Sequence, residues 1–156
     1  MLNQHFTATG IVFNCRGEVL LIKHRKLHVW LPPGGHVEEN ELPDDAVLRE
    51  IYEETGIRAE ILPNKRGLSL SSEHARELET PFAVLLVDIE GDGKHSHIDL
   101  IYACKAMNDV FVPNENEITD AGWFSCDQIC DLETFDNVRK TIICAARTTR
   151  WTPQSE

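Results

Sequence analysis

Residues 35–57 constrain the fold most, because a glycine-rich stretch runs directly into an acidic segment with helical periodicity. Apolar residues recur at helical spacing from Pro43 to Thr55, Pro43 suits the first turn of a helix, and Gly56 suits the left-handed conformation that ends one. The segment holds one Arg and eight carboxylates: Glu38, Glu39, Glu41, Asp44, Asp45, Glu50, Glu53 and Glu54. We therefore predict a helix over Pro43–Thr55 whose charge is strongly one-sided.

Three of these carboxylates share one face of the predicted helix, since Glu50, Glu53 and Glu54 stand at i, i+3 and i+4. Like charges at this spacing repel by about 0.2–0.5 kcal/mol per pair, and the single Arg49 can offset only part of that repulsion. Oxygen donors at this density suit Mg²⁺ or Mn²⁺. A solvated acidic face is the alternative for such a triplet taken alone, so the surrounding pattern has to decide.

The surrounding pattern is G-x5-E-x7-R-E-U-x-E-E-x-G-U, where U is a bulky aliphatic residue. Its fixed positions are all filled, by Gly35, Glu41, Arg49, Glu50, Ile51, Glu53, Glu54, Gly56 and Ile57. The pattern resembles the Nudix box of the Nudix hydrolases, and the preceding WLPPGG of residues 30–35 resembles the usual entry to that box. The rest of the chain resembles the family more loosely, through strand order and the pair Trp123-Phe124.

The resemblance implies a reaction in which water attacks phosphorus and cleaves a pyrophosphate linkage of a nucleoside diphosphate derivative, with Mg²⁺ or Mn²⁺ bound. By position, it implies that Glu50, Glu53 and Glu54 carry the metal, with the carbonyl of Gly34 as a further ligand. Bound metal neutralises phosphate charge and lowers the pKa of coordinated water.

Supporting roles also follow from the resemblance. Arg49 and Glu41 are expected to form an ion pair that fixes the loop against the helix and orients the carboxylates. A further Glu from a distant loop is expected as metal ligand or general base. Glu117 is the candidate, six residues before Trp123, and Glu115 is the alternative.

Other polar residues have both functional and structural interpretations. Arg25 and Lys26, just before the glycine-rich loop, could contact substrate phosphates or lie at a solvated strand end. His36 stands at a variable position of the box and is not expected to be a ligand. For His95 and His97, which flank a predicted turn, we expect a surface or strand-edge position.

The order of elements in the rest of the chain predicts an α/β (α+β) fold with a sheet packed between helices, in one domain over residues 1–156. The resemblance implies that this fold is a Nudix-type α/β/α sandwich with a mixed central sheet. Strands are expected in TATGIVFN, RGEVLLIKH, RAEIL, PFAVLLVDIE and HSHIDLIYACKA, the last two forming a hairpin with burial on both faces. Ser125 and Gln128 predict a capping box and a short helix through Leu132. A last helix should present Phe135, Val138, Ile142 and Ala146 on one face.

Charge and composition exclude several classes of protein. A net charge of −11 disfavours a protein that binds duplex nucleic acid. The longest apolar run, residues 82–87, is too short to span a membrane, and the N-terminus lacks the features of a secretory signal. Five scattered cysteines fit reduced thiols and a cytoplasmic protein, and Cys126 and Cys130 are expected to be buried as small hydrophobic residues. The expected assembly is a monomer or homodimer.

The substrate is predicted only by class. A nucleoside triphosphate or related nucleotide is expected, because a chain of 156 residues leaves little structure to recognise a second large group. In the family that this sequence resembles, a Pro past the box is typical of the ADP-ribose subclass and a Tyr of the dinucleoside-polyphosphate subclass. This chain has Glu73 and His74 at those two positions. The alternatives are hydrolysis of ADP-ribose, a nucleotide sugar or a dinucleoside polyphosphate, or a regulatory module that binds a nucleotide without turnover.

Overall fold

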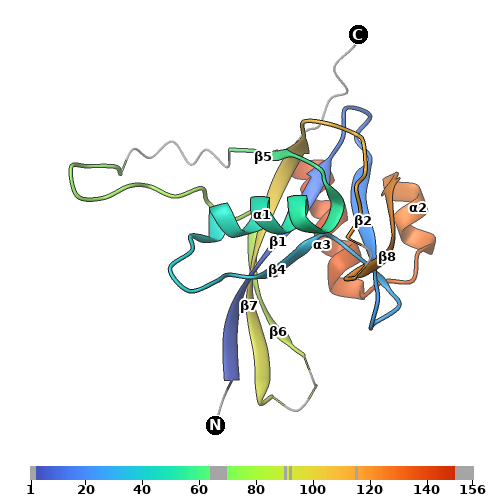
Figure 1. The fold of residues 1–156 in the computed structure, drawn as a ribbon, viewed down its shortest axis with the longest axis horizontal. Coiled ribbons are helices and arrows are strands. Elements are labelled where there is room, and N and C mark those ends of the chain that lie inside the picture. Colours follow the sequence, from blue (N-terminus) through green and yellow to red (C-terminus); the bar gives the residue numbers. More distant parts are fainter. Residues whose placement is uncertain (1–2, 64–69, 90, 92, 115, 150–156) are drawn as a thin grey trace.

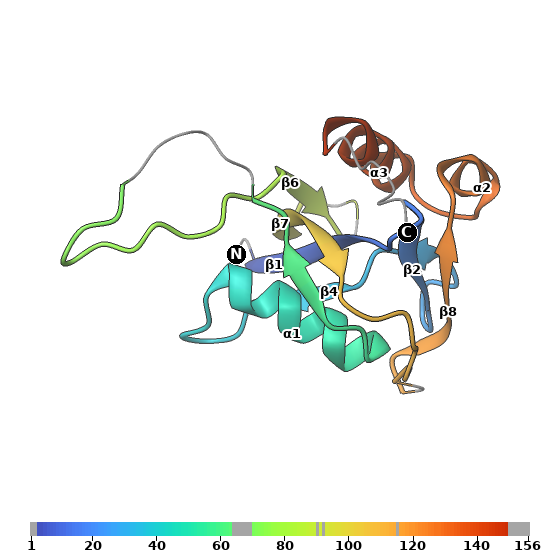
Figure 2. The same cartoon turned by 90° about the horizontal axis from the view of Figure 1, so that it is seen from above.

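The computed structural model describes residues 3–63, 70–89, 91, 93–114 and 116–149. In this structure a mixed sheet carries helices on both of its faces. Figure 1 shows the elements, and Figure 2 shows α1 (Pro43–Thr55) on one side of the sheet and α2 (Cys126–Asp131) and α3 (Asp136–Thr148) on the other. This is the predicted α/β/α sandwich.

The sheet is built around a long parallel pair. Its strands are β1 (Asn3–Phe13), β2 (Val19–His24), β3 (Trp30–Leu31), β4 (Gly34–His36), β5 (Ala59–Ile61), β6 (Ala83–Asp88), β7 (His95–Ala106) and β8 (Ile118–Phe124). The main path runs β3-β2-β1-β7-β5, while β4 pairs with β1, β6 with β7 and β8 with β2. β1 and β7 are parallel, and all the other pairs are antiparallel.

Strand alternation divides the interior into two cores. Along β1, Ala8 and Val12 face α1 and pack with its Val47 and Ile51, whereas alternate β1 residues face the other helices. The core on that second side contains Ile11, Phe13, Ile101, Ile129 and Ile142, with further buried residues. Side chains at odd positions of β1 and β7 therefore look toward α3, which matters for the cavities described below.

Helix α1 has the predicted bounds. Leu42 precedes it and gives no side-chain cap, while Gly56 ends it with φ 71° and donates its backbone N–H to the carbonyl of Tyr52. α1 lies close against β1 at Gly10, where an added Cβ would come within 2.6 Å of Ile51 Cδ1. A side chain there would force the Ile51 side chain to shift, so Gly10 allows α1 and β1 to pack closely.

Several further expectations are confirmed. The capping box joins Ser125 and Gln128 at the start of α2. β6 and β7 form the expected hairpin, although Asp92 of its turn lies outside the described residues. Trp30 and Phe124, whose ring centroids are 4.8 Å apart, pack against the second core. All five cysteines are free.

Other expectations were wrong. β6 is not buried on both faces, because it pairs only with β7 in the described sheet and leaves Val84 and Leu86 57% and 69% exposed. Cys130 is exposed rather than buried, and Cys126 is half-buried. β3 and β4 fall in the stretch predicted as loop, and β8 was not predicted as a strand at all.

In the part of the chain that the structure describes, no helix is long and apolar enough to cross a membrane.

Candidate functional site

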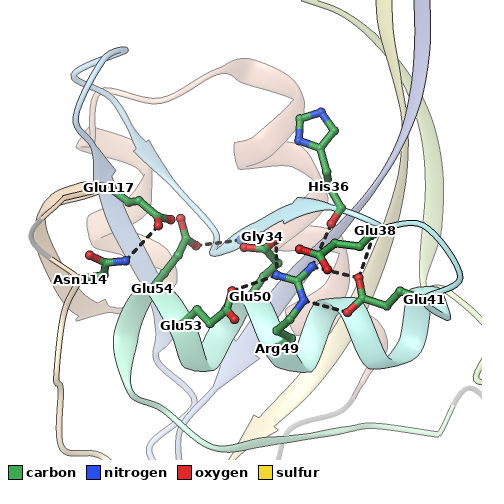
Figure 3. A network of polar contacts seen from close by, with 10 residues as sticks. All are labelled: Gly34, His36, Glu38, Glu41, Arg49, Glu50, Glu53, Glu54, Asn114 and Glu117. Carbon is green, nitrogen blue, oxygen red and sulfur yellow. Dashed lines mark hydrogen bonds and ion pairs between the residues drawn. The ribbon is translucent and has the colours of Figure 1, made fainter.

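The predicted site residues meet where the start of β4, one face of α1 and the loop before β8 come together (Figure 3). Glu50 and Glu54 from α1, Gly34 from β4 and Glu117 from the loop line one cavity of about 430 Å³. Arg25 and Lys26 line the same cavity. Glu53 lies beside it with a more exposed side chain, and Glu115 is outside the described residues.

Arg49 organises the carboxylates. Its guanidinium donates two hydrogen bonds to Glu41, at 2.8 and 3.0 Å, which is the predicted ion pair. It also donates to Glu50 at 2.8 Å, to Glu53 at 2.9 Å and to the backbone carbonyl of His36 at 3.0 Å (Figure 3). One planar group thus ties the loop to two carboxylates of α1. Hydrogen bonds from Arg49 hold the pKa of Glu41 below its ordinary value.

Glu54 is the most buried of the three helix carboxylates, with 5% of its surface exposed. Its Oε2 accepts a hydrogen bond from the backbone N–H of Gly34 at 3.0 Å. Burial raises the pKa of Glu54 to about 8, with smaller contributions from the charges of Glu50 and Glu117, although the Gly34 bond acts against the rise. The pKa of Glu50 is raised mainly by burial as well, against the effect of Arg49.

Asn114 holds Glu117 at the site, and sequence reasoning did not identify it. Its backbone N–H donates to the carbonyl of Glu54 at 2.9 Å, which ties the loop to the end of α1. Its side-chain amide donates to Glu117 Oε1 at 2.9 Å (Figure 3). Backbone bonds from Glu117 and Ile118 to the Asn114 carbonyl complete the turn. The only sequence signal is an Asn at a polar turn before the candidate Glu, which is a common feature of turns.

The donor set fits a divalent cation. Four carboxylates line one cavity, those of Glu38, Glu50, Glu54 and Glu117, and burial and mutual repulsion raise the pKa values of two of them, Glu50 and Glu54. A hard cation with oxygen preference would relieve both effects. Within the described residues, no three acidic, His or Cys side chains already surround a common point, so the carboxylates would turn toward the ion on binding.

A second cavity adjoins the first. It measures about 500 Å³ and lies between the sheet and α3, and it shares Pro32, Gly34, Gly35 and His36 with the carboxylate cavity. Its walls are mostly apolar, with Leu85, Val87, Ile101, Val138 and Ile142 among them.

The polar floor of this second cavity centres on Asp99. The hydroxyls of Thr7 and Thr9 both donate to Asp99 Oδ1, at 3.0 and 2.8 Å. Burial raises the pKa of Asp99 despite these bonds. Sequence reasoning missed Asp99 because it sits within an apolar strand pattern with no motif around it.

Gly35 leaves room for the carboxylate of Glu50, because a Cβ there would lie 2.5 Å from Glu50 Oε1. We expect Gly35→Ala to displace the flexible end of Glu50 and to weaken Mg²⁺ binding by at least about tenfold, while the fold is kept. Isothermal titration of Mg²⁺, with a melting curve of the metal-free variant, would measure both effects.

Gly34→Ala is the matched comparison. A Cβ at Gly34 would lie 2.5 Å from the backbone carbonyl oxygen of Ala8, which cannot move alone. This variant should lose about 1–3 kcal/mol of unfolding free energy. The prediction is contradicted if Gly35→Ala loses as much stability as Gly34→Ala and keeps the Mg²⁺ affinity of the wild type. Glu50 would then not need the space that Gly35 leaves beside its carboxylate.

Comparison with known proteins identifies the family. A sequence model described as NUDIX domain matches residues 3–146. A putative 8-oxo-dGTP diphosphatase of Bacillus subtilis (strain 168) is 43% identical over 49 residues, which are 31% of this chain and 33% of that protein. A probable DHNTP pyrophosphohydrolase of Lactococcus lactis subsp. cremoris (strain MG1363) is 31% identical over 96 residues, 62% of this chain and 51% of that protein. The chain therefore spans less than two thirds of the length of these curated relatives.

A solved structure agrees over nearly the whole chain. The crystal structure of a NUDIX-family hydrolase from Clostridium perfringens has a TM-score of 0.76 and 27% identity, and the match covers 94% of this chain and 99% of that one. The full set of box residues and the match over residues 3–146 lead to one conclusion. This chain belongs to the Nudix hydrolase family.

Proposed function

We propose that this protein hydrolyses a pyrophosphate linkage in a nucleoside diphosphate derivative, with a nucleoside triphosphate or related nucleotide as the substrate. The observation that carries the proposal is the pair of joined cavities, one lined by carboxylates and one mostly apolar. A nucleotide has the same two-part chemistry, a polyphosphate and a flat, largely apolar base. The shared wall at Gly34 and Gly35 would lie where the two parts of such a ligand meet.

Each residue of the carboxylate cavity has a proposed task. Glu50, Glu53, Glu54 and the carbonyl of Gly34 hold the divalent metal, Mg²⁺ or Mn²⁺. When bound, the metal neutralises phosphate charge and lowers the pKa of coordinated water. Glu117 accepts a proton from the water that attacks phosphorus.

The remaining residues position these groups and the substrate. Arg49 and Glu41 keep the helix carboxylates aimed into the cavity. Arg25 and Lys26, on the same cavity wall, bind the substrate phosphates. Attack of water breaks the bond between phosphorus and the bridging oxygen, and the leaving phosphate carries that oxygen away.

The second cavity would take the nucleoside. Its apolar walls suit a base, and Asp99 offers a carboxyl on the floor. Because both Thr hydroxyls donate to Asp99 Oδ1, the second oxygen, Oδ2, is the one that an amino or imino group of a base could use. The printed names of the two curated relatives described above refer to 8-oxo-dGTP and to DHNTP, both of which are triphosphates.

The test is product formation from a panel of nucleoside triphosphates, including oxidised guanine and pterin triphosphates, with ADP-ribose, nucleotide sugars and dinucleoside polyphosphates beside them. Each substrate is assayed with Mg²⁺, with Mn²⁺ and with EDTA, and a coupled phosphatase reveals the products. We expect metal-dependent turnover of triphosphates. Turnover of only the other groups would contradict the substrate class. No turnover at all, with a substrate-induced rise in melting temperature, would identify a binding module instead.

A further inference from the structure

Four of the seven histidines in the chain lie together on the face of the sheet that looks toward α3. They are His5 on β1, His36 on β4, and His95 and His97 on β7. The parallel pairing of β1 with β7 places His5 beside His97. The antiparallel pairing of β1 with β4 places His36 beside Thr7, which is two residues from His5 on the same face of β1. Residues distant in sequence thus form one histidine cluster, outside the carboxylate cavity except for His36, which borders it.

Five of the ring separations in this histidine cluster are close to those that tetrahedral ligation by imidazoles requires. Ring centroids lie 5.2 Å apart for His5 and His36, 4.9 Å for His36 and His97, and 6.0 Å for His5 and His97. His95 lies 5.2 Å from His97 and 5.4 Å from His5. A zinc–nitrogen bond of about 2.0–2.1 Å puts each ring centroid about 3.2 Å from the ion, so a tetrahedral arrangement separates the centroids by about 5.2 Å.

The ring nitrogens also suit ligation. His97 Nε2 is buried and has no hydrogen-bond partner among the described residues. Asn3 Oδ1 lies 2.8 Å from His5 Nε2, and because a carbonyl oxygen can only accept, that nitrogen carries the proton and Nδ1 keeps the lone pair. His36 is exposed, so an ion can reach the cluster from solvent.

We propose that the histidine cluster binds a borderline transition-metal ion of the Zn²⁺ class, through His5, His36 and His97 with His95 as the fourth ligand. In the described part of the chain these nitrogens do not yet converge on one point, so the rings turn on binding. Imidazole nitrogen prefers Zn²⁺, Ni²⁺ and Cu²⁺, whereas the carboxylates of α1 prefer Mg²⁺ or Mn²⁺. The two sites therefore select different ions, and this one does not depend on the proposed reaction.

A metal in the cluster would act on the neighbouring cavities. His36 and His97 line the second cavity, and the His36 carbonyl accepts a hydrogen bond from Arg49. An ion bound to the His36 ring would therefore restrain both the wall of the second cavity and the backbone at His36, to which Arg49 donates.

The test is titration of tag-free protein with ZnCl₂ in saturating Mg²⁺, so that the carboxylates are already occupied, followed calorimetrically. We expect one Zn²⁺ per chain. His97→Gln and His36→Gln should each weaken binding by at least about tenfold. The control is His74→Gln, which changes an exposed histidine outside the cluster and should bind as the wild type does.

His36→Gln and His97→Gln together separate a loss of zinc ligands from a disturbance of the sheet. His97 is half-buried and its replacement could disturb the sheet, whereas His36 is exposed and keeps its backbone contact with Arg49 when the ring is removed. Replacing Zn²⁺ by Co²⁺ should give the visible absorption of tetrahedral nitrogen ligation in the wild type and not in His36→Gln. Binding that is equal in wild type, His36→Gln and His97→Gln, or no Zn²⁺ binding at all, would overturn the proposal.

Discussion

Glu53→Gln should lower kcat/KM for the best substrate by at least about 100-fold, which corresponds to about 2.7 kcal/mol of lost transition-state stabilisation. The amide keeps the size of the side chain and an oxygen that can still accept from Arg49, at the position where Glu53 Oε2 now lies 2.9 Å from Nη1. It removes the negative charge that would hold the metal. The effect should therefore fall on the reaction and not on the fold.

Stability should change little in this variant. The side chain of Glu53 is 53% exposed, and ion pairs at such positions contribute about 0–1 kcal/mol. Loss of one charge from a repelling group of carboxylates also works in favour of the folded state. A melting temperature within a few degrees of the wild type would confirm that the loss of activity is chemical.

Glu39→Gln is the matched control, because Glu39 is an exposed carboxylate of the same segment that stands at none of the fixed positions of the box. It should keep wild-type rates with Mg²⁺. Near wild-type rates in Glu53→Gln as well would show that the assignment of Glu53 to the metal is wrong.

Local sequence chemistry predicted α1 well and the neighbouring strands poorly. Pro43 and Gly56 mark the two ends of the helix through their backbone preferences, so its bounds needed no tertiary information. β4 covers only Gly34–His36, and its strand conformation comes from pairing with β1, which no local propensity of glycine predicts. β8 was missed because its first residues, Ile118 to Asp120, follow a polar turn and alternate weakly.

The site divides in the same way. Glu50, Glu53 and Glu54 share a helix, so their spacing in sequence gives their spacing in space. Asp99 and the histidine cluster depend on the parallel register of β1 and β7, which joins residues about 90 positions apart, such as Thr9 and Asp99. Glu117 was identified only through the family resemblance, and its position depends on Asn114.

Glu54→Gln should stabilise the metal-free protein at alkaline pH and abolish its response to Mg²⁺. The pKa of Glu54 is raised from 4.5 to about 8 by burial. Between these two values the folded protein holds a proton that the unfolded chain has released, so unfolding releases a proton and becomes more favourable as pH rises. The unfolding free energy of the metal-free wild type should therefore fall by up to about 1.4 kcal/mol per pH unit across this window.

The amide does not ionise, and its oxygen can still accept the N–H of Gly34, so Glu54→Gln should lack this component of the pH dependence. Urea unfolding in EDTA at pH 5.5, 7.0 and 8.5 would measure it, with Glu39→Gln as the control that follows the wild type. Parallel pH profiles for Glu54→Gln and wild type would contradict a buried, protonated Glu54.

Mg²⁺ should reverse the alkaline loss in the wild type, because the ion and the proton compete for the same carboxylate and binding only the folded state stabilises it. The rise in melting temperature on adding Mg²⁺ should thus be larger at pH 8.5 than at pH 5.5, and absent in Glu54→Gln. A rise of equal size at both pH values would place the ion away from Glu54. The raised pKa of Glu54 and the need for a cation then have one physical cause, which is the burial of Glu54 close to the carboxylates of Glu50 and Glu117.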